Sequence, residues 1–300
     1  MGQNAETFAK QTEQMREGAG FIAALDQSGG STPKALGLYG VTQDMYDGED
    51  AMFAEIHQMR SRIITAPDFT DAKVIGAILF ERTMRGEVEG KPTAQALWED
   101  RGIVPFLKID KGLEDKANGV QLMKPIPGVE ETLQEAVQFG IFGTKERSVI
   151  HEADAEGIRA IVDQQFDLGQ TVRAAGLVPI LEPEVDIHSP TKAEAEDMLK
   201  AEILTHLNAL EPGQEVMLKL TIPTQEGLYD ELADHPRVIR VVALSGGYST
   251  DDACARLARQ PKMIASFSRA LTEGLSKQQS DDAFNAALGA NIDKIYQASV

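Results

Sequence analysis

The chain has 300 residues, 42% of them hydrophobic, with one cysteine, and its formal net charge at pH 7 is −18. This composition suits a soluble protein with a large core, while the single Cys254 rules out an intrachain disulfide and fits a reducing cytoplasm. The negative charge argues against nucleic acid and anionic membranes as partners, and without a long apolar run we expect neither a membrane span nor a secretory signal.

Strand-like and helix-like segments alternate along the chain. Eight apolar runs of strand length are each followed by a segment with helical periodicity. The runs cover residues 20–26, 74–80, 104–110, 142–147, 177–184, 216–223, 238–245 and 262–268, and the fourth has the weakest strand pattern. Eight strand–helix repeats in one chain predict a (β/α)8 barrel, the TIM-barrel fold of the α/β class.

Amphipathic periodicity is clearest in the segments between the strands. We expect helices over residues 50–64, 129–139, 155–175 and 193–210, an extra leading helix over 4–16 and a closing helix over 281–298. Thr191 and Glu194 have the spacing of a capping box at the start of the fourth of these helices. Because no linker or change of composition interrupts the pattern, we expect residues 1–300 to form a single catalytic domain.

A lysine, Lys219, lies inside the apolar run over residues 216–223. On a strand that is buried on both faces a charged ammonium is costly, and a lysine there tends to lose its proton. A neutral lysine amine is a nucleophile for carbonyl carbons. The alternative interpretation is a structural ion pair between this lysine and a carboxylate.

Ionisable and polar residues also end nearly every other predicted strand. Barrel enzymes carry their chemistry at the carboxyl ends of the strands, so these residues are expected to converge on one mouth. Any one of them alone is more simply explained as a solvated loop charge, but their joint placement favours a site. They are Asp26, Ser28 and Ser31, then Glu81, Lys108, Asp110, Lys145, Arg147, Glu182 and Glu184, and finally Ser245, Gly246, Gly247 and Arg269.

Six short segments at these strand ends occur in an order that is similar to one known enzyme family. They are residues 24–28 (ALDQS), 106–112 (FLKIDKG), 181–184 (LEPE), 218–219 (LK), 244–247 (LSGG) and 266–271 (SFSRAL). In sequence and spacing they resemble class I fructose-bisphosphate aldolase, and the likeness runs from about Phe21 to Leu271. No single segment identifies the family, whereas six in order across a predicted barrel favour it.

The resemblance implies a lyase that reversibly cleaves fructose 1,6-bisphosphate to dihydroxyacetone phosphate and glyceraldehyde 3-phosphate, in glycolysis and gluconeogenesis. Lys219 would form the Schiff base, with Lys145 as the neighbouring cation that favours its neutral form. Glu182 would be the acid and base for carbinolamine formation and dehydration, supported by Glu184. Asp26 would assist proton removal from the C4 hydroxyl.

The resemblance also implies two phosphate sites and substrate contacts for Lys145 and Arg147. Ser245, Gly246, Gly247, Ser266, Ser268 and Arg269 would hold the C1 phosphate, where barrels commonly bind phosphate. Ser28, Ser31 and Lys108 would meet the C6 phosphate. The loop over residues 28–31 is equally compatible with an ordinary turn between a strand and a helix.

The chain departs from the family pattern in two places. Lys34 and Ala35 stand where many relatives have a Lys-Arg pair, so one phosphate-facing arginine is missing. Animal members have a C-terminal tail whose last tyrosine handles the C3 proton, whereas this sequence ends at Val300 and Tyr296 falls in the predicted closing helix. The carrier of the C3 proton is therefore open.

Three other interpretations remain beside this one. The first is a metal-dependent aldolase using Glu182, Asp186 and His188, but the five histidines form no HxH or HxxxH pair, so we expect no metal and no cofactor. The second is another Schiff-base barrel lyase or a transaldolase, which need not have two phosphate sites. The third is a barrel retained for binding or scaffolding. The expected partner is a phosphorylated sugar, and no helix face is apolar enough to decide for or against a homo-oligomer.

Overall fold

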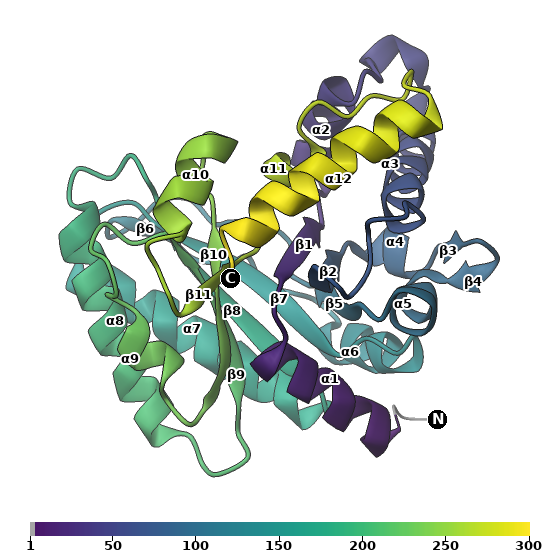
Figure 1. The fold of residues 1–300 in the computed structure, drawn as a ribbon. Coiled ribbons are helices and arrows are strands. Elements are labelled where there is room, and N and C mark those ends of the chain that lie inside the picture. The colour runs from purple at the N-terminus through teal and green to yellow at the C-terminus, as the bar shows by residue number, and fades with distance from the viewer. Residues whose placement is uncertain (1–3) are drawn as a thin grey trace.

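Eight parallel strands surround one axis in the computed structural model, which describes residues 4–300 (Figure 1). In spatial order they are β1 (Phe21–Leu25), β2 (Val74–Leu79), β5 (Val104–Lys108), β7 (Gly143–Ile150), β8 (Val178–Val185), β9 (Val216–Thr221), β10 (Val238–Leu244) and β11 (Met263–Ala265). The ring closes where the backbone N–H of Ala24 donates to the carbonyl of Phe267 at 3.3 Å. The predicted (β/α)8 barrel is therefore confirmed.

Helices follow the strands and cover the outside of the barrel. They are α2 (Thr32–Leu38), α3 (Gly48–Ile64), α4 (Glu81–Met84), α5 (Thr93–Gln95), α6 (Val129–Gln138), α7 (Ala155–Ala174), α8 (Lys192–Ala209), α9 (Asp230–Ala233), α10 (Thr250–Leu257), α11 (Arg269–Thr272) and α12 (Asp281–Gln297). A hairpin of β3 (Glu87–Val88) and β4 (Lys91–Pro92) follows α4, and β6 (Val120–Gln121) pairs antiparallel with β7. Among the described helices, none has the length and apolarity required to cross a membrane.

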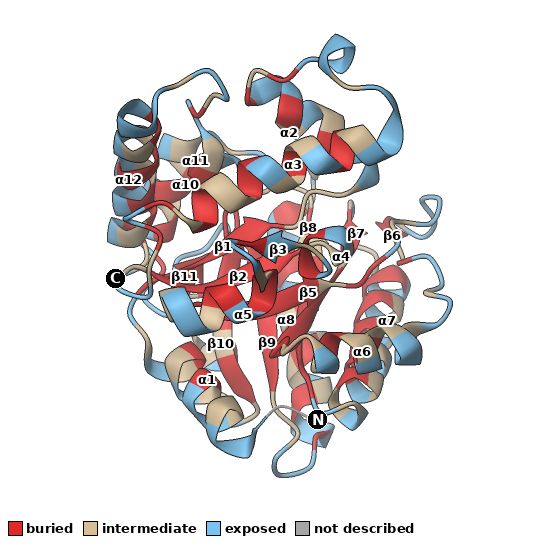
Figure 2. Ribbon diagram, turned by 90° about the vertical axis from the view of Figure 1, so that its right-hand side faces the viewer, coloured by how far each residue is buried: buried red, intermediate tan, exposed pale blue. Residues whose placement is uncertain are grey.

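The strands are buried on both faces, as their near-continuous apolar sequences require (Figure 2). Side chains alternate between two hydrophobic clusters. On β9, Val216 and Leu218 belong to the cluster beneath the helices, whereas Met217 belongs to the cluster inside the barrel. This alternation turns Lys219, two residues after Met217, toward the barrel axis.

An additional helix, α1 (Ala5–Glu17), closes the amino end of the barrel, opposite α2 and α3 (Figures 1 and 2). Its Met15 packs into the interior cluster. The amide of Gln14 donates to the carbonyls of Ile75 at 2.9 Å and Gly102 at 2.7 Å, and the guanidinium of Arg240 donates to the carbonyl of Met15 at 2.8 Å. The predicted leading helix is thus the plug of the barrel.

Two sequence-based expectations were wrong in detail, and a third, the strand with the weakest pattern, is confirmed and is longer than expected. The Thr191 hydroxyl does not cap α8, because it accepts a hydrogen bond from the backbone N–H of Ala153 instead. The run over residues 262–268 gives only a three-residue strand, since the N–H of Ala265 donates to the Ser299 hydroxyl. The run over 142–147, with the weakest pattern, forms the eight-residue β7, whose polar side chains are buried by partners on both faces.

Close approach of backbones at Gly143 gives a stability prediction. A Cβ at this position would lie 2.2 Å from the carbonyl oxygen of Val178 and 3.0 Å from the ring of Phe106. Gly143→Ala should lower the unfolding free energy, measured by urea denaturation, by about 2 kcal/mol or more. The added methyl group would overlap a backbone carbonyl, which cannot move aside as a flexible side chain can. Gly37→Ala is the control: its Cβ would meet nothing within 4 Å in α2, so stability should be unchanged or higher. Equal stability of Gly143→Ala and wild type would contradict the packing.

Candidate active site

A cavity of about 920 Å³ opens at the carboxyl ends of the strands. Every residue that the sequence assigned to catalysis or phosphate binding lines it. Glu81, the other charged strand end, does not, because its carboxylate pairs with Lys111 and Arg85. The topology explains the convergence, since all eight strands are parallel and their carboxyl ends meet on one face.

Lys145 is the centre of the charge network in this cavity. Its Nζ lies 2.8 Å from Asp26 Oδ2 and 2.9 Å from Glu182 Oε2. A third carboxylate, Asp110, lies 3.9 Å away. Burial alone would lower the pKa of Lys145, which is 3% exposed, but these carboxylates raise the pKa above its ordinary value. Lys145 is therefore a permanent cation at neutral pH.

Asp26 is the ionised counterpart of this cation. Burial raises the pKa of its carboxyl group, but the cations of Lys145, Lys219 and Lys108 outweigh burial and lower the pKa below its ordinary value. Asp26 therefore remains a carboxylate at neutral pH, at the end of β1 and within the mouth.

Glu182 lies between the two lysines. Its second oxygen, Oε1, is 3.2 Å from Lys219 Nζ, while Oε2 faces Lys145. Lys219 thus has the ion pair that the alternative interpretation predicted, and its partner is a group that accepts and returns protons. Lys145, Glu182 and Lys219 thus lie on the neighbouring strands β7, β8 and β9, with one carboxylate between two amines, an arrangement that can transfer protons to and from an amine.

Asp110 orders the wall between β5 and β7. Its Oδ1 accepts a hydrogen bond from Lys108 Nζ at 2.7 Å, and its Oδ2 accepts from the backbone N–H of Arg147 at 3.3 Å. The buried Asp110 carboxylate therefore contacts the Lys108 ammonium and the backbone of β7, and it lies near the Lys145 ammonium. The sequence predicts Asp110 at a strand end but gives it no role. The pattern that points to a role is a carboxylate two residues from a lysine on the same predicted strand.

Arg147 and Glu184 form the outer rim of the same wall. Arg147 Nε lies 3.0 Å from Glu184 Oε2. Burial raises the pKa of Glu184, and Arg147 only partly offsets this effect. The Glu184 carboxyl group therefore holds a proton more readily than an ordinary glutamate, beside the ionised Asp26 and Lys145.

The loops after β10 and β11 form part of the cavity wall and carry one arginine, Arg269. Gly246 and Gly247 have φ values of 61° and 121°, and a Cβ on Gly246 would lie 2.6 Å from the Ile187 side chain. The buried hydroxyl of Ser266 has no hydrogen-bond partner among the described residues. Within the same part of the chain, no carboxylate pairs with Arg269, which lies beside Gly247. A hydroxyl and a guanidinium without protein partners suit an anion.

The loop after β1 lies beside the loop after β11, where the Gln27 amide donates to the Ser268 hydroxyl at 2.6 Å. Residues Gly29–Ser31 form one turn of 3₁₀-helix, and the Ser31 hydroxyl donates to the carbonyl of Ser28 at 3.0 Å. This hydrogen bond belongs to the ordinary turn that was the alternative interpretation of residues 28–31. Ser31 therefore has a structural partner and also lines the cavity. Lys34, one helical turn further, lines the cavity with no ion pair among the described residues. Sequence reasoning had mentioned Lys34 only as part of a departure from a pattern.

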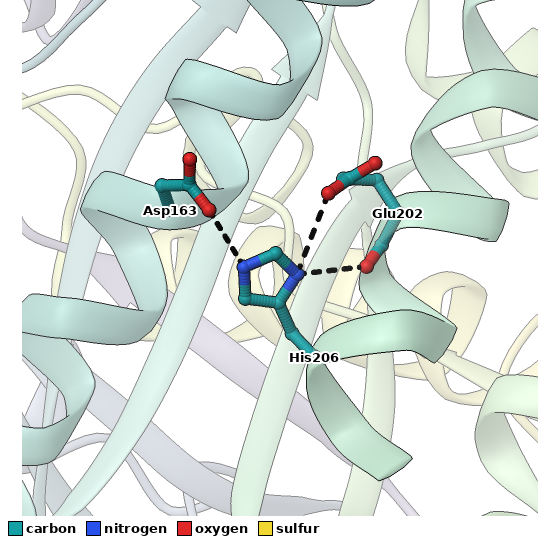
Figure 3. A group of neighbouring side chains, drawn as sticks. All are labelled: Asp163, Glu202 and His206. Atoms are coloured by element: carbon teal, nitrogen blue, oxygen red, sulfur yellow. Dashed lines mark hydrogen bonds and ion pairs between the residues drawn. The ribbon is translucent and has the colours of Figure 1, made fainter. Parts of the chain in front are cut away.

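Metal-ligand side chains gather elsewhere. Among the described residues, one group of three metal-ligand side chains, Asp163, Glu202 and His206, lies on the outer surface between α7 and α8 (Figure 3). His206 Nε2 is 2.8 Å from Asp163 Oδ1, and Nδ1 is 3.0 Å from the carbonyl of Glu202. Both ring nitrogens already face protein oxygens, so this group links two helices. At the mouth, His151 Nδ1 lies 3.2 Å from Asp186 Oδ2, and His188 contributes its backbone N–H to Asp186.

Comparison with known proteins agrees with this geometry. Residues 7–223 match the family model described as fructose-bisphosphate aldolase class-I. Two curated relatives named fructose-bisphosphate aldolase class 1 are similar over nearly their whole length. The one from Porphyromonas gingivalis is 59% identical, with 97% of this chain and 99% of the relative covered, and the one from Synechocystis sp. is 58% identical, with 98% of each covered.

The chain belongs to the class I fructose-bisphosphate aldolases. A solved structure of the Plasmodium falciparum aldolase, in complex with TRAP and a small-molecule inhibitor, has the same fold, with a TM-score of 0.75 at 20% identity and coverage of 99% of this chain and 96% of that one. The barrel thus persists where most side chains differ.

Arg60 is a residue of this aldolase that sequence reasoning missed. It lies on α3 with 0% exposure and donates to the carbonyl of Gln27 at 2.6 Å and to the Thr83 hydroxyl at 2.6 Å. Burial lowers the pKa of Arg60 to about 10, against the opposing effect of Asp26. Its bond to Gln27 fixes the backbone directly after Asp26. The sequence pattern that points to Arg60 is a charged residue on the apolar face of α3, next to Met59 and Ile63.

Glu146 lies behind the site, on the face of β7 opposite Lys145. It is fully buried, and Thr144 donates to its Oε2 at 3.1 Å. Its other oxygen has no hydrogen-bond partner among the described residues. Burial raises the pKa of Glu146 well above 4.5, and nearby Asp110 adds to the effect against a hydrogen bond from Thr144. The Glu146 carboxyl group therefore keeps its proton to a higher pH than an ordinary glutamate does.

The raised pKa of Glu146 predicts a pH-dependent stability. The folded protein binds this proton more tightly than the unfolded chain, so the contribution is fully present below pH 4.5 and is lost as pH rises toward the folded pKa. The unfolding free energy of wild type relative to Glu146→Gln should fall by up to about 1.4 kcal/mol per pH unit in this window, measured by urea denaturation. Glu13→Gln, at an exposed site, should show little pH dependence. A pH-independent difference for Glu146→Gln would contradict the raised pKa of Glu146.

Proposed function

We propose that the protein catalyses the reversible aldol cleavage of fructose 1,6-bisphosphate to dihydroxyacetone phosphate and glyceraldehyde 3-phosphate through an imine on Lys219. The observation that carries this proposal is the contact series from Lys219 through Glu182 and Lys145 to Asp26, buried on the inner face of the barrel. An amine beside a base is the arrangement that imine formation requires.

We assign the first half of the reaction to Lys219 and Glu182. The free electron pair on Lys219 Nζ attacks the C2 carbonyl carbon once Glu182 has taken the ammonium proton across their 3.2 Å contact. A second proton passes from the attacking nitrogen to the former carbonyl oxygen, which gives the carbinolamine. Glu182 then returns its own proton to the carbinolamine hydroxyl, which leaves as water and gives the iminium. Lys145 keeps its proton throughout, because three carboxylates surround it.

We assign the cleavage step to Asp26. As a carboxylate it accepts the proton of the C4 hydroxyl, while the C3–C4 bond breaks and its electron pair moves into the iminium to form an enamine. Glyceraldehyde 3-phosphate departs as the aldehyde. Lys145, 2.8 Å from Asp26, offsets the negative charge that would otherwise repel the substrate.

We propose that two sets of residues at the mouth hold the two phosphates. Ser245, Gly246, Gly247, Ser266, Ser268 and Arg269 would hold the C1 phosphate, and Ser28, Ser31 and Lys108 with Lys34 would meet the C6 phosphate. Support comes from Arg269 and Lys34, which are cations without a protein carboxylate among the described residues. An anionic substrate then supplies the missing counter-ions.

For the return of the C3 proton we propose Glu182 or the substrate phosphate as carrier. Tyr296 lies in α12 and outside the residues that line the mouth. Its neighbours include Lys73, which precedes β2 at the amino end of the barrel. We also propose that residues 1–300 work as one catalytic domain in the cytoplasm, in keeping with a glycolytic family and a single cysteine.

The imine gives the most direct test. Borohydride with dihydroxyacetone phosphate should inactivate the enzyme and attach the reduced substrate to Lys219, located by peptide mass mapping. Lys219→Arg should be inactive and unlabelled, because a guanidinium stays protonated and is not a nucleophile. Borohydride without substrate is the control and should leave activity intact. Label on another lysine would sink the assignment of Lys219.

Arg269→Ala tests the proposed C1 phosphate site. Loss of a charged hydrogen bond to phosphate should raise KM for fructose 1,6-bisphosphate about 10- to 100-fold, with a smaller change in kcat. Arg259→Ala is the matched control, because Arg259 is exposed and pairs with Glu226 away from the mouth. If the two variants have the same steady-state kinetics, Arg269 does not bind the phosphate.

A further inference from the structure

Strands β8 and β9 separate at the level of the proposed chemistry. Their parallel backbone pairing runs as far as Leu181 and Leu218, one residue before Glu182 and Lys219. Each strand stays paired beyond this level on its other side, β8 with β7 and β9 with β10. The proposed base and the proposed nucleophile therefore lie where the backbone ladder between their own two strands stops.

Thr221 joins the two strands again beyond this point. Its hydroxyl donates to the carbonyl of Val185 at 2.7 Å and accepts from the backbone N–H of the same residue at 2.9 Å. Thr221 is 1% exposed, so water does not compete for these hydrogen bonds. One side chain thus takes the place of the backbone hydrogen bonds that would otherwise connect the carboxyl ends of β8 and β9.

The bridge lies close to the pair that exchanges a proton. Thr221 comes two residues after Lys219 on β9, and Val185 comes three residues after Glu182 on β8. Because a strand rises about 3.3 Å per residue, the bridge is about 7 to 10 Å along the strands from these two residues. The gap between the strands is therefore fixed on both sides of the 3.2 Å contact, by the backbone ladder toward the amino end and by the hydroxyl toward the carboxyl end.

The methyl group of the same threonine has a different neighbour. A Cβ on Gly246 would lie 3.7 Å from Thr221 Cγ2, which is ordinary van der Waals distance. The hydroxyl thus joins β9 to β8, while the methyl group lies beside the loop of the proposed C1 phosphate site. Substitutions that keep one group and remove the other separate these two contacts.

We propose that Thr221 is a positioning residue that sets the distance between Glu182 and Lys219 for imine formation. The inference rests on the proposed function of these two groups. Proton transfer and attack by the amine both depend steeply on the geometry of the reacting atoms. Thr221 is not among the described residues that line the mouth, so it acts through Glu182 and Lys219 rather than on the substrate.

Thr221→Val tests the bridge, because valine has the shape of threonine but forms no hydrogen bond with Val185. The rate of borohydride trapping with dihydroxyacetone phosphate should fall about 10- to 100-fold, since the reacting pair is no longer held in place. KM for fructose 1,6-bisphosphate should change less, because valine keeps the methyl group beside Gly246. The Val185 amide should exchange its hydrogen for deuterium faster than in wild type.

The label on Lys219 distinguishes the two ways in which this test can fail. If wild type and Thr221→Val are both labelled at Lys219 and at the same rate, Thr221 does not set the reacting geometry, although the imine stands. If wild type carries no label on Lys219, the proposed imine itself is wrong.

A second pair of variants differs by the hydroxyl alone. Thr221→Ser keeps the hydrogen bonds to Val185 and should retain most of the wild-type trapping rate, whereas Thr221→Ala should be as slow as Thr221→Val. This pair decides the matter if the valine variant does not fold. Equal trapping rates of the serine and alanine variants would overturn the inference.

Thr93→Val is the matched control for a loss of stability alone. Thr93 is also fully buried, and its hydroxyl donates to the carbonyl of Gly86 at 3.0 Å, away from the mouth. This variant should unfold at a lower urea concentration than wild type and yet be trapped at the wild-type rate. If Thr93→Val is trapped as slowly as Thr221→Val, the effect at Thr221 comes from stability and not from positioning.

Discussion

The structure depends on keeping the charge of Lys145 at the centre of a buried network. A cation with 3% exposure is tolerated only because Asp26 and Glu182 lie within 2.9 Å of it and Asp110 lies 3.9 Å away. Removal of any one partner would leave an uncompensated charge in the barrel. The same network keeps Asp26 ionised and holds Glu182 between two lysines, so stability and chemistry rest on one set of contacts.

The barrel makes this network possible by its alternation of side chains. Residues of one parity pack beneath the helices, and residues of the other parity face the axis. Toward the amino end the inward positions are apolar, with Met15, Phe106 and Met217 among them, and α1 closes that end. Toward the carboxyl end the same positions are charged. The side chains that face the axis therefore change from apolar to charged along the barrel, and the bottom of the mouth lies where this change occurs.

The charges divide into two groups with different roles. Lys145 and Lys108 are neutralised by carboxylates of the protein, whereas Arg269 and Lys34 have no such partner among the described residues. The first group fixes geometry, and the second is available to an anionic ligand. In a strongly acidic chain, unpaired cations thus mark the places where anions are expected.

The sequence by itself determined the barrel, because eight apolar runs separated by amphipathic segments admit few other folds, and it placed Lys219, Glu182 and Asp26 at strand ends. It did not determine the partners. Arg60 lies 33 residues from Gln27 and Asp110 lies 37 residues from Arg147, so no local pattern reveals these contacts. β7 had the weakest strand pattern because most of its polar residues find their partners on other strands and on α7, as Lys145 does at Glu182 and Ser148 does at Gln165. Only the tertiary structure decided which charges are paired, since pairing is set by distance in space and by burial.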